Sequence, residues 1–283
     1  MKNLLRSLFI TTFVAASAAS LAVAALCLWK DGPTSPWLGT LLATAAPSLF
    51  FLNLLLHRTA RTTHHLLPMT LAGVAGTALS ILLAGTALHL AAFTAAVIGV
   101  AGVNLYVYGY SRFAAPIGSP LHRGALLSRF SLWDNGVQVT SIELTTEPAL
   151  WVFYRGNWCP LCMAQIREVA AQYRELSRRG VQVYMVSPQP EENSAALSRR
   201  FDAPMRFLTD RDNAAAIALG ICEKNGLPMG LQVLGYDSDV PRPTVLLTDR
   251  GGKLMYCHLT DNYRVRPEPA DFLAVLDAHA SPA

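Results

Sequence analysis

Hydrophobic positions are distributed very differently in the two parts of this chain. The first 110 residues consist of long apolar runs broken by short polar stretches, whereas the remainder alternates short apolar segments with polar ones. A helix needs about 20 apolar residues to cross the hydrocarbon core of a bilayer, and the run at 66–110 is about twice that length. We therefore expect an all-α transmembrane bundle at residues 1–112, whose four helices span about residues 4–29, 37–57, 66–87 and 90–110.

The placement of charge supports this division and suggests an orientation. Between Asp31 and Arg112 the chain has no acidic residue and only two arginines. The first apolar run is longer than the apolar region of a signal peptide, so we expect it to be retained as a span. With four spans, nearly all Lys and Arg near the span ends fall on one side, which is normally the cytoplasmic side. We therefore expect an integral protein of the lipid bilayer, in a bacterial inner membrane, with a cytoplasmic C-terminal domain; three spans would place that domain in the periplasm.

Composition narrows the choice of partners. The sequence is 52% hydrophobic and 15% charged, a low charged fraction for a soluble protein, and its formal net charge is +4. Nucleic-acid binding needs a concentrated basic face with aromatic platforms, whereas the basic residues here are scattered. We therefore exclude a nucleic-acid partner.

The pattern of elements changes after a linker at residues 113–127, which contains several Pro and Gly residues. Asp134-Asn135-Gly136 predicts a hairpin over residues 131–144. A strand at 151–154, a helix at 163–179 and a β-branched strand at 181–186 form a βαβ unit, which implies parallel pairing. The remaining helices and strands of an α/β domain at 128–283 are expected at residues 191–201, 205–209, 213–219, 244–248, 254–258 and 270–280.

Two of the five cysteines, Cys159 and Cys162, lie at the turn between the strand and the helix of this unit. Unpaired N–H groups at a helix start favour a thiolate, which is the reactive form of cysteine. We therefore expect Cys159 to attack and Cys162, one helical turn later, to resolve the mixed disulfide. Pro160 at the first helical position loses no hydrogen bond. Arg155 is a candidate for adding positive charge beside Cys159, although an arginine at a strand end is often solvated.

Two cysteines at this spacing can also form half of a zinc site. A structural zinc ion needs two more ligands, and Cys257-His258 is the only candidate complement in the sequence. Adjacent residues on a strand point to opposite faces, so both cannot easily bind one ion. We therefore favour a redox dithiol and expect neither a metal nor another cofactor.

From about Phe130 to the end, the sequence resembles the redoxin or peroxiredoxin-like (AhpC/TSA) branch of the thioredoxin superfamily. The resemblance rests on the order of elements, on the segment RGNWCPLC in which Trp158 precedes the two cysteines, and on Pro243 before the strand that begins at Thr244. It implies a thioredoxin-like domain with a central mixed sheet, in which Pro243 corresponds to the cis-proline that packs against the cysteines. Arg242, just before it, is a candidate substrate contact.

The resemblance leaves three functions open. Typical peroxiredoxins carry Thr or Ser three residues before the reactive cysteine, where this chain has Gly156, whereas the CxxC spacing matches a dithiol-disulfide exchanger. We therefore expect a membrane-tethered thiol-disulfide oxidoreductase acting on a disulfide or dithiol protein or on a small thiol. The alternatives are a thiol peroxidase with Cys159 as peroxidatic residue and a peroxide as substrate, and a non-enzymatic redox sensor or assembly factor. Arg264 and Arg266 are expected to be solvated in a surface loop.

Overall fold

The structure is a computed structural model that describes residues 2–56, 59–85, 89–114, 119–201 and 203–280. The expected turn between the third and fourth spans and part of the expected linker, at residues 86–88 and 115–118, lie outside the described residues, as does the expected end of the second span at residue 57. The chain forms two compact units, one of Met1–Arg58 with Thr62–Arg112 and one of Thr59–Arg61 with Phe113–Ala283. Each unit is described by itself below.

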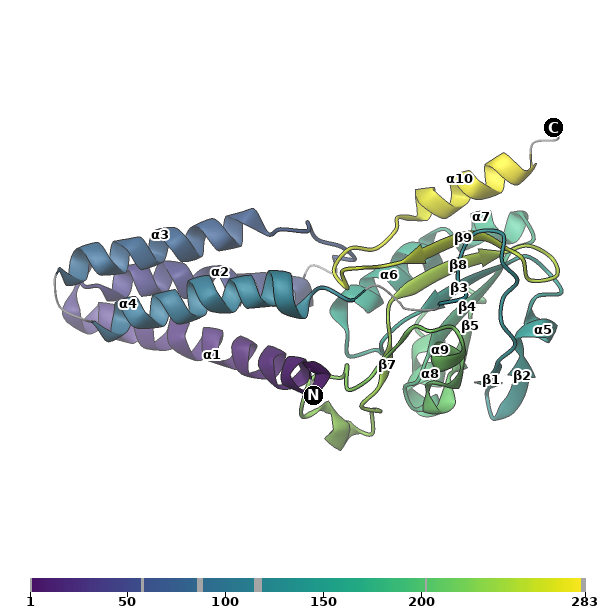
Figure 1. The fold of residues 1–283 in the computed structure, drawn as a ribbon, viewed down its shortest axis with the longest axis horizontal. Helices are drawn as coiled ribbons and strands as arrows, with labels where there is room; N and C mark the ends of the chain where they lie inside the picture. Colours follow the sequence, from purple (N-terminus) through teal and green to yellow (C-terminus); the bar gives the residue numbers. More distant parts are fainter. Residues whose placement is uncertain (1, 57–58, 86–88, 115–118, 202, 281–283) are drawn as a thin grey trace. The chain divides into compact units, whose positions relative to one another are not determined.

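The first unit is built from long helices (Figure 1). Among the described residues, four helices are long and apolar enough to cross a membrane, as the hydrophobic pattern predicted. The fourth departs from regular α-helical geometry, because α4 is followed by two π-helical segments, η1 and η2. The elements are α1 (Lys2–Asp31), α2 (Trp37–Leu56), α3 (Leu67–Ala84), α4 (Leu90–Thr94), η1 (Ala95–Gly102) and η2 (Leu105–Tyr110).

Small residues bring these helices close together. A Cβ atom placed on Gly39 of α2 would lie 2.2 Å from the carbonyl oxygen of Gly76 in α3, so the two backbones touch. Next to this contact, the Thr40 hydroxyl lies 3.2 Å from that of Ser80 and donates to the carbonyl of Ala91 at 2.8 Å. Close backbone approach and hydroxyl bonds of this kind hold helices together in lipid, where the hydrophobic effect supplies little attraction.

The second unit is organised around a seven-stranded mixed sheet in the order β2-β1-β5-β4-β3-β8-β9 (Figure 1). The neighbours β3–β4 and β4–β5 are parallel and the other pairs are antiparallel. This is the thioredoxin-like arrangement that the resemblance implied. The strands are β1 (Ser131–Asp134), β2 (Val137–Thr140), β3 (Ala149–Phe153), β4 (Gln182–Ser187), β5 (Arg206–Thr209), β8 (Thr244–Thr248) and β9 (Leu254–Leu259).

Helices and short elements complete the second unit. The helix expected over 163–179 has Pro160 at its first position, as the sequence indicated, and is interrupted at Gln172 into α6 and α7. The stretch between 219 and 243, for which the sequence predicted no element, contains a two-stranded ribbon and a 3-10 turn. The elements are α5 (Ser141–Leu144), α6 (Pro160–Ala171), α7 (Tyr173–Arg178), α8 (Glu191–Ser198), η3 (Arg211–Asn213), α9 (Ala214–Ala218), β6 (Cys222–Glu223), η4 (Leu231–Leu234), β7 (Val240–Pro241) and α10 (Pro269–Ala280).

Strand β3 positions the reactive segment. It lies between β4 and β8, and all five of its residues are buried. Because side chains alternate along a strand, Trp151 and Phe153 join Tyr184 and Leu246 in the core on one face of the sheet. The Trp151 indole also donates to the Thr248 hydroxyl at 3.2 Å. The end of β3 is therefore rigidly held, and the segment that leads to the cysteines starts from it.

Candidate active site

Cys159 and Cys162 lie at the turn between β3 and α6. Cys159 is the N-cap residue of α6, with an extended backbone (φ −92°, ψ 109°), and Pro160 occupies the first helical position. The Cys159 sulfur accepts the backbone N–H of Cys162 at 3.3 Å. A thiol at this position takes the place of the oxygen of a Ser or Asp cap, so the helix start stabilises negative charge on it.

The two sulfurs are in direct contact and shielded from solvent. Their Sγ atoms lie 2.7 Å apart, and both cysteines are free. Only 3% of Cys159 and none of Cys162 is exposed. A disulfide between them requires little movement, whereas a large substrate requires the surroundings to open.

Arg266 provides the positive charge at this pair. Its Nη2 atom lies 3.4 Å from the Cys162 sulfur and 3.8 Å from that of Cys159, and its Nη1 donates to the Gln165 side chain at 2.7 Å. The prediction that Arg264 and Arg266 are solvated is wrong, since they are 0% and 3% exposed. A buried guanidinium is costly unless it faces a negative charge. The burial of Arg266 against the two sulfurs therefore indicates that the cysteine pair carries a negative charge.

The two thiols share a proton unequally. Burial by itself raises the pKa of both, because it disfavours the charged form. At Cys162 the hydrogen bond with the Cys159 sulfur and the charge of Arg266 outweigh burial, so its pKa falls well below the ordinary value. At Cys159, burial and the bond to Cys162 hold the pKa well above it. The pair as a whole is therefore set up to hold one negative charge beside Arg266.

Arg155 is a second buried arginine whose charge acts on the pair. It is buried, its guanidinium stacks over the Trp158 ring at 4.9 Å and over the Tyr263 ring at 5.5 Å, and it donates to the carbonyl of Gly226. Its charge lowers the pKa of the Cys159 thiol, against the larger effect of burial. The sequence left open whether Arg155 is solvated or adds charge beside Cys159. The structure places it inside the protein, close enough for its charge to act on Cys159.

Gly156 has a structural reason to be glycine. Its φ of +148° is rarely adopted by other residues, and a Cβ atom there would lie 2.5 Å from Nε1 of Trp158. A Thr or Ser at this position would collide with the indole ring. The missing hydroxyl is thus linked to the position of Trp158, which also forms the stacking partner of Arg155.

A polar network centred on Gln189, which the sequence did not reveal, holds the segment between β3 and Cys159 in place. The Gln189 side chain accepts the backbone N–H of Asn157 at 2.8 Å, and its amide nitrogen donates to the hydroxyls of Tyr154 at 3.0 Å and Ser194 at 3.1 Å. Tyr154 is fully buried, and burial together with the charge of Cys162 raises the pKa of its phenol. Gln189 follows β4 with no sequence motif around it, so nothing local could have identified it.

Arg242 and Pro243 occupy the segment before β8. The buried Arg242 guanidinium forms an ion pair with the half-buried Glu223 and donates to the carbonyl of Ala114 at 2.7 Å. Among the described residues no peptide bond is cis, so the expectation of a cis-proline at 243 is wrong. The chain passes from β7 through Arg242 and Pro243 into β8, and a trans bond continues this extended path. Pro243 is buried beside Thr244, which pairs with Phe153 at the end of β3.

The described residues contain no group of three or more His, Cys, Asp or Glu side chains that could hold a metal ion. The groups that gather around the sulfurs are instead hydrogen-bond donors and two guanidinium cations, which suit a thiolate and a polar substrate.

Comparison with known proteins shows what the domain is similar to. Residues 124–257 match the sequence model of the AhpC/TSA family. Over 163 residues, 57% of this chain and 99% of the relative, the sequence is 25% identical to peroxiredoxin Bcp of Escherichia coli.

Similar solved structures include two that cover 56% of this chain. One is reduced Prx3 from Vibrio vulnificus, of which 99% is covered, with a TM-score of 0.49 and 17% identity. The other is peroxidoxin BcpB from Mycobacterium tuberculosis, of which 100% is covered, with a TM-score of 0.46 and 21% identity. The sequence match, the mixed sheet and the cysteine pair at the start of α6 lead to one conclusion: the C-terminal part of this chain is a peroxiredoxin-like redoxin domain of the thioredoxin superfamily, a thiol-dependent oxidoreductase.

Proposed function

We propose that the protein is a membrane-anchored thiol peroxidase that forms a Cys159–Cys162 disulfide in each turnover. The observation that carries the proposal is the burial of both sulfurs against the guanidinium of Arg266, with the charge of Arg155 also acting on Cys159. A peroxide is small and polar enough to reach such a site, whereas a protein disulfide needs an exposed attacking sulfur. The match to the AhpC/TSA family supports the same chemistry.

The reaction balances with the residues present. A cysteine thiolate attacks the terminal peroxide oxygen, the O–O bond breaks, and the leaving alkoxide or hydroxide takes up a proton. The product is a sulfenic acid, which the second sulfur attacks to form the S–S bond and release water. One peroxide and two thiols thus give one alcohol or water, one further water and one disulfide. An external dithiol then reduces the disulfide by thiol-disulfide exchange.

We assign the first attack to Cys159. It is the more accessible of the two sulfurs and lies at the helix N-cap, where its sulfur already accepts an N–H. The two sulfurs are 2.7 Å apart and hydrogen-bonded, so a proton transfer between them can place the negative charge on Cys159 for the attack. The indole Nε1 of Trp158 is buried and has no hydrogen-bond partner among the described residues, which leaves it free to donate to a peroxide oxygen.

Peroxide consumption by the purified full chain in detergent, with a dithiol as reductant, tests this proposal. We expect turnover in the wild type, none in Cys159→Ser, and a sulfenic acid without turnover in Cys162→Ser. If Cys162→Ser were inert and Cys159→Ser formed the sulfenic acid, the assignment of the two roles would be reversed. If neither the wild type nor any variant consumed peroxide, and the wild type reduced a protein disulfide, the peroxidase proposal would be wrong.

A thiol-disulfide oxidoreductase is the second candidate, favoured by the CxxC spacing and by the contact between the two sulfurs. It shares the reductive half of the peroxidase cycle. The two differ in the oxidant, so the relative rates with hydrogen peroxide and with a protein disulfide decide between them.

We also propose that the protein resides in a bacterial inner membrane with the redoxin domain in the cytoplasm. The proposal rests on the charge at the span ends and on an even number of crossings. A reporter fused after Ala283 tests it, since a periplasmic signal would require an odd number of crossings. A cytoplasmic domain would meet reducing partners, because the cytosol keeps thiols reduced.

A further inference from the structure

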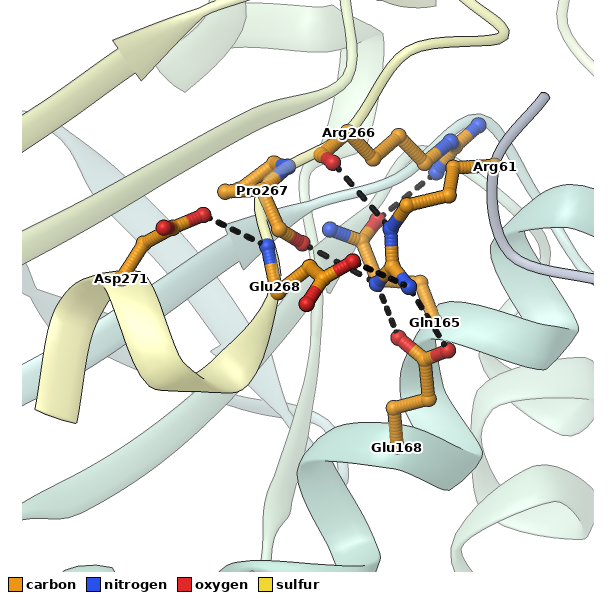
Figure 2. A network of polar contacts seen from close by, with 7 residues as sticks. All are labelled: Arg61, Gln165, Glu168, Arg266, Pro267, Glu268 and Asp271. Carbon is orange, nitrogen blue, oxygen red and sulfur yellow. Dashed lines mark hydrogen bonds and ion pairs between the residues drawn. The ribbon is translucent and has the colours of Figure 1, made fainter. Parts of the chain in front are cut away.

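Arg61 lies outside the redoxin domain in sequence but inside the second unit in space. It belongs to the short stretch between α2 and α3, and its contacts assign it with Thr59–Arg61 to the unit that contains the dithiol. Figure 2 shows its side chain among residues of α6 and of the loop before α10. Its side chain is 27% exposed, so it is held largely within the protein.

The Arg61 guanidinium is engaged on several sides. Its Nε donates to the carbonyl of Arg266 at 3.3 Å, and its Nη2 donates to the carbonyl of Pro267 at 3.3 Å. Two of its nitrogens bond both carboxylate oxygens of Glu168, and Glu268 lies 3.6 Å from Nη1. This pattern needs the planar fork of arginine, since a lysine presents a single nitrogen.

These contacts join the two elements that hold the catalytic charge. Glu168 lies one turn after Gln165 on α6, so both residues share a face of the helix. Gln165 accepts from the Arg266 side chain, while Glu168 binds Arg61, which in turn holds the Arg266 backbone (Figure 2). The segment Arg266–Pro267 is therefore tied to α6 at both its side chain and its main chain.

The other end of the loop is fixed as well. The backbone N–H of Glu268 donates to the Asp271 carboxylate at 2.8 Å, which holds the start of α10. Arg266 has a long side chain with many rotamers, so its contact with the sulfurs depends on where its backbone is placed. Without Arg61, the backbone carbonyls of Arg266 and Pro267 would lose the side chain that holds them against α6.

We propose that Arg61 is a positioning residue that keeps Arg266 against the Cys159–Cys162 pair, so that the stretch between α2 and α3 supplies part of the dithiol site. Arg61 acts through Arg266 and does not touch the sulfurs itself. The inference rests on the proposed function only in taking this dithiol as the reactive site, and it holds for a peroxidase and a disulfide exchanger alike.

The test is the pH profile of iodoacetamide alkylation of the reduced full chain in detergent, read at Cys159 and Cys162 by mass spectrometry. In Arg61→Ala and Glu168→Ala we expect the profile to move to higher pH, with alkylation at pH 6 about three- to tenfold slower, because a less well-placed cation stabilises the thiolate less. Arg61→Lys should recover part of the loss. Arg178→Ala, which removes an exposed arginine paired with Glu175, is the matched control and should leave the profile unchanged.

A double variant makes the test specific. If Arg61 acts through the Glu168 bridge, Arg61→Ala should change the profile less in a Glu168→Ala background than in the wild type. An Arg61→Ala protein with a lower melting temperature but an unshifted profile would overturn the proposal, because the residue would then be structural only. A shifted profile in a protein that consumes no peroxide would refute the peroxidase proposal and leave the positioning role in place.

Discussion

The two units of this protein differ in what they bury. Among the described residues of the helical unit, the buried polar side chains are Ser and Thr, which can bond the backbone of their own or a neighbouring helix. The described residues of the redoxin unit include four buried arginines, Arg155, Arg242, Arg264 and Arg266. Of these, Arg266 contacts the sulfurs and Arg155 acts on Cys159 through its charge. Uncompensated buried charge is costly, so its location marks where a protein performs work other than folding. The contrast agrees with the proposed division into a membrane anchor and a reaction centre.

The largest effect should come from Arg242, the buried arginine that does not face the sulfurs. Arg242→Ala leaves the half-buried Glu223 without its cation and removes the packing of a buried side chain, which together should cost about 2–3 kcal/mol. We expect a strong loss of stability in chemical denaturation and an almost unchanged alkylation profile in the protein that remains folded. A large shift in that profile would show that Arg242 also acts on the dithiol.

For Arg266 we expect the reverse, a large effect on reactivity and a smaller one on stability. Arg266→Ala removes the cation nearest the sulfurs, and we expect peroxide consumption to fall on the order of 100-fold, as when one preorganised donor is removed from an active site. Stopped-flow measurement with the full chain checks this. The comparison between buried arginines would fail if Arg266→Ala reacted as fast as the wild type.

In the helical unit we expect changes in stability without changes in chemistry. Gly76→Ala introduces a methyl group 2.5 Å from the Gly39 carbonyl oxygen and should destabilise the helix contact by about 1–3 kcal/mol. Thermal unfolding in detergent measures the loss. The alkylation profile of the cysteines should stay as in the wild type, and a shift of that profile would contradict the division into anchor and reaction centre.

The smallest effect is the pH dependence of the wild type itself. The pKa of Cys162 is lowered, so the pair keeps its negative charge as the pH falls and loses it only on passing through that lowered pKa. An ordinary thiol with a pKa of about 8.5 reacts roughly tenfold more slowly for each pH unit below that value. We expect the rate with hydrogen peroxide to change by less than about threefold between pH 8 and pH 6. A tenfold fall per unit would show that Arg266 does not stabilise the thiolate.

Much of the fold followed from local patterns. The four apolar helices, the Asn135-Gly136 turn and the strand that ends at Phe153 each carry their own signal over a few neighbouring residues, and all are present. The ribbon of β6 and β7 was missed because strands of two residues have no periodicity to detect.

The cysteine pair was found for the same local reason, but its surroundings were not. Arg266 approaches Cys162 across 104 residues of sequence, and Arg61 reaches Glu168 across 107. Neither arginine stands in a motif, and the sequence led us to expect Arg266 in a solvated surface loop. Their roles come from the way the chain folds, so only the three-dimensional arrangement could reveal them.

The most direct test of the account is a single turnover. The fully reduced chain is mixed with one equivalent of hydrogen peroxide, quenched with an alkylating agent and digested for mass spectrometry. The account predicts a disulfide between Cys159 and Cys162 within one chain, with Cys27, Cys222 and Cys257 alkylated. Free Cys159 and Cys162 after peroxide has been added, together with their rapid oxidation by a protein disulfide, would contradict it.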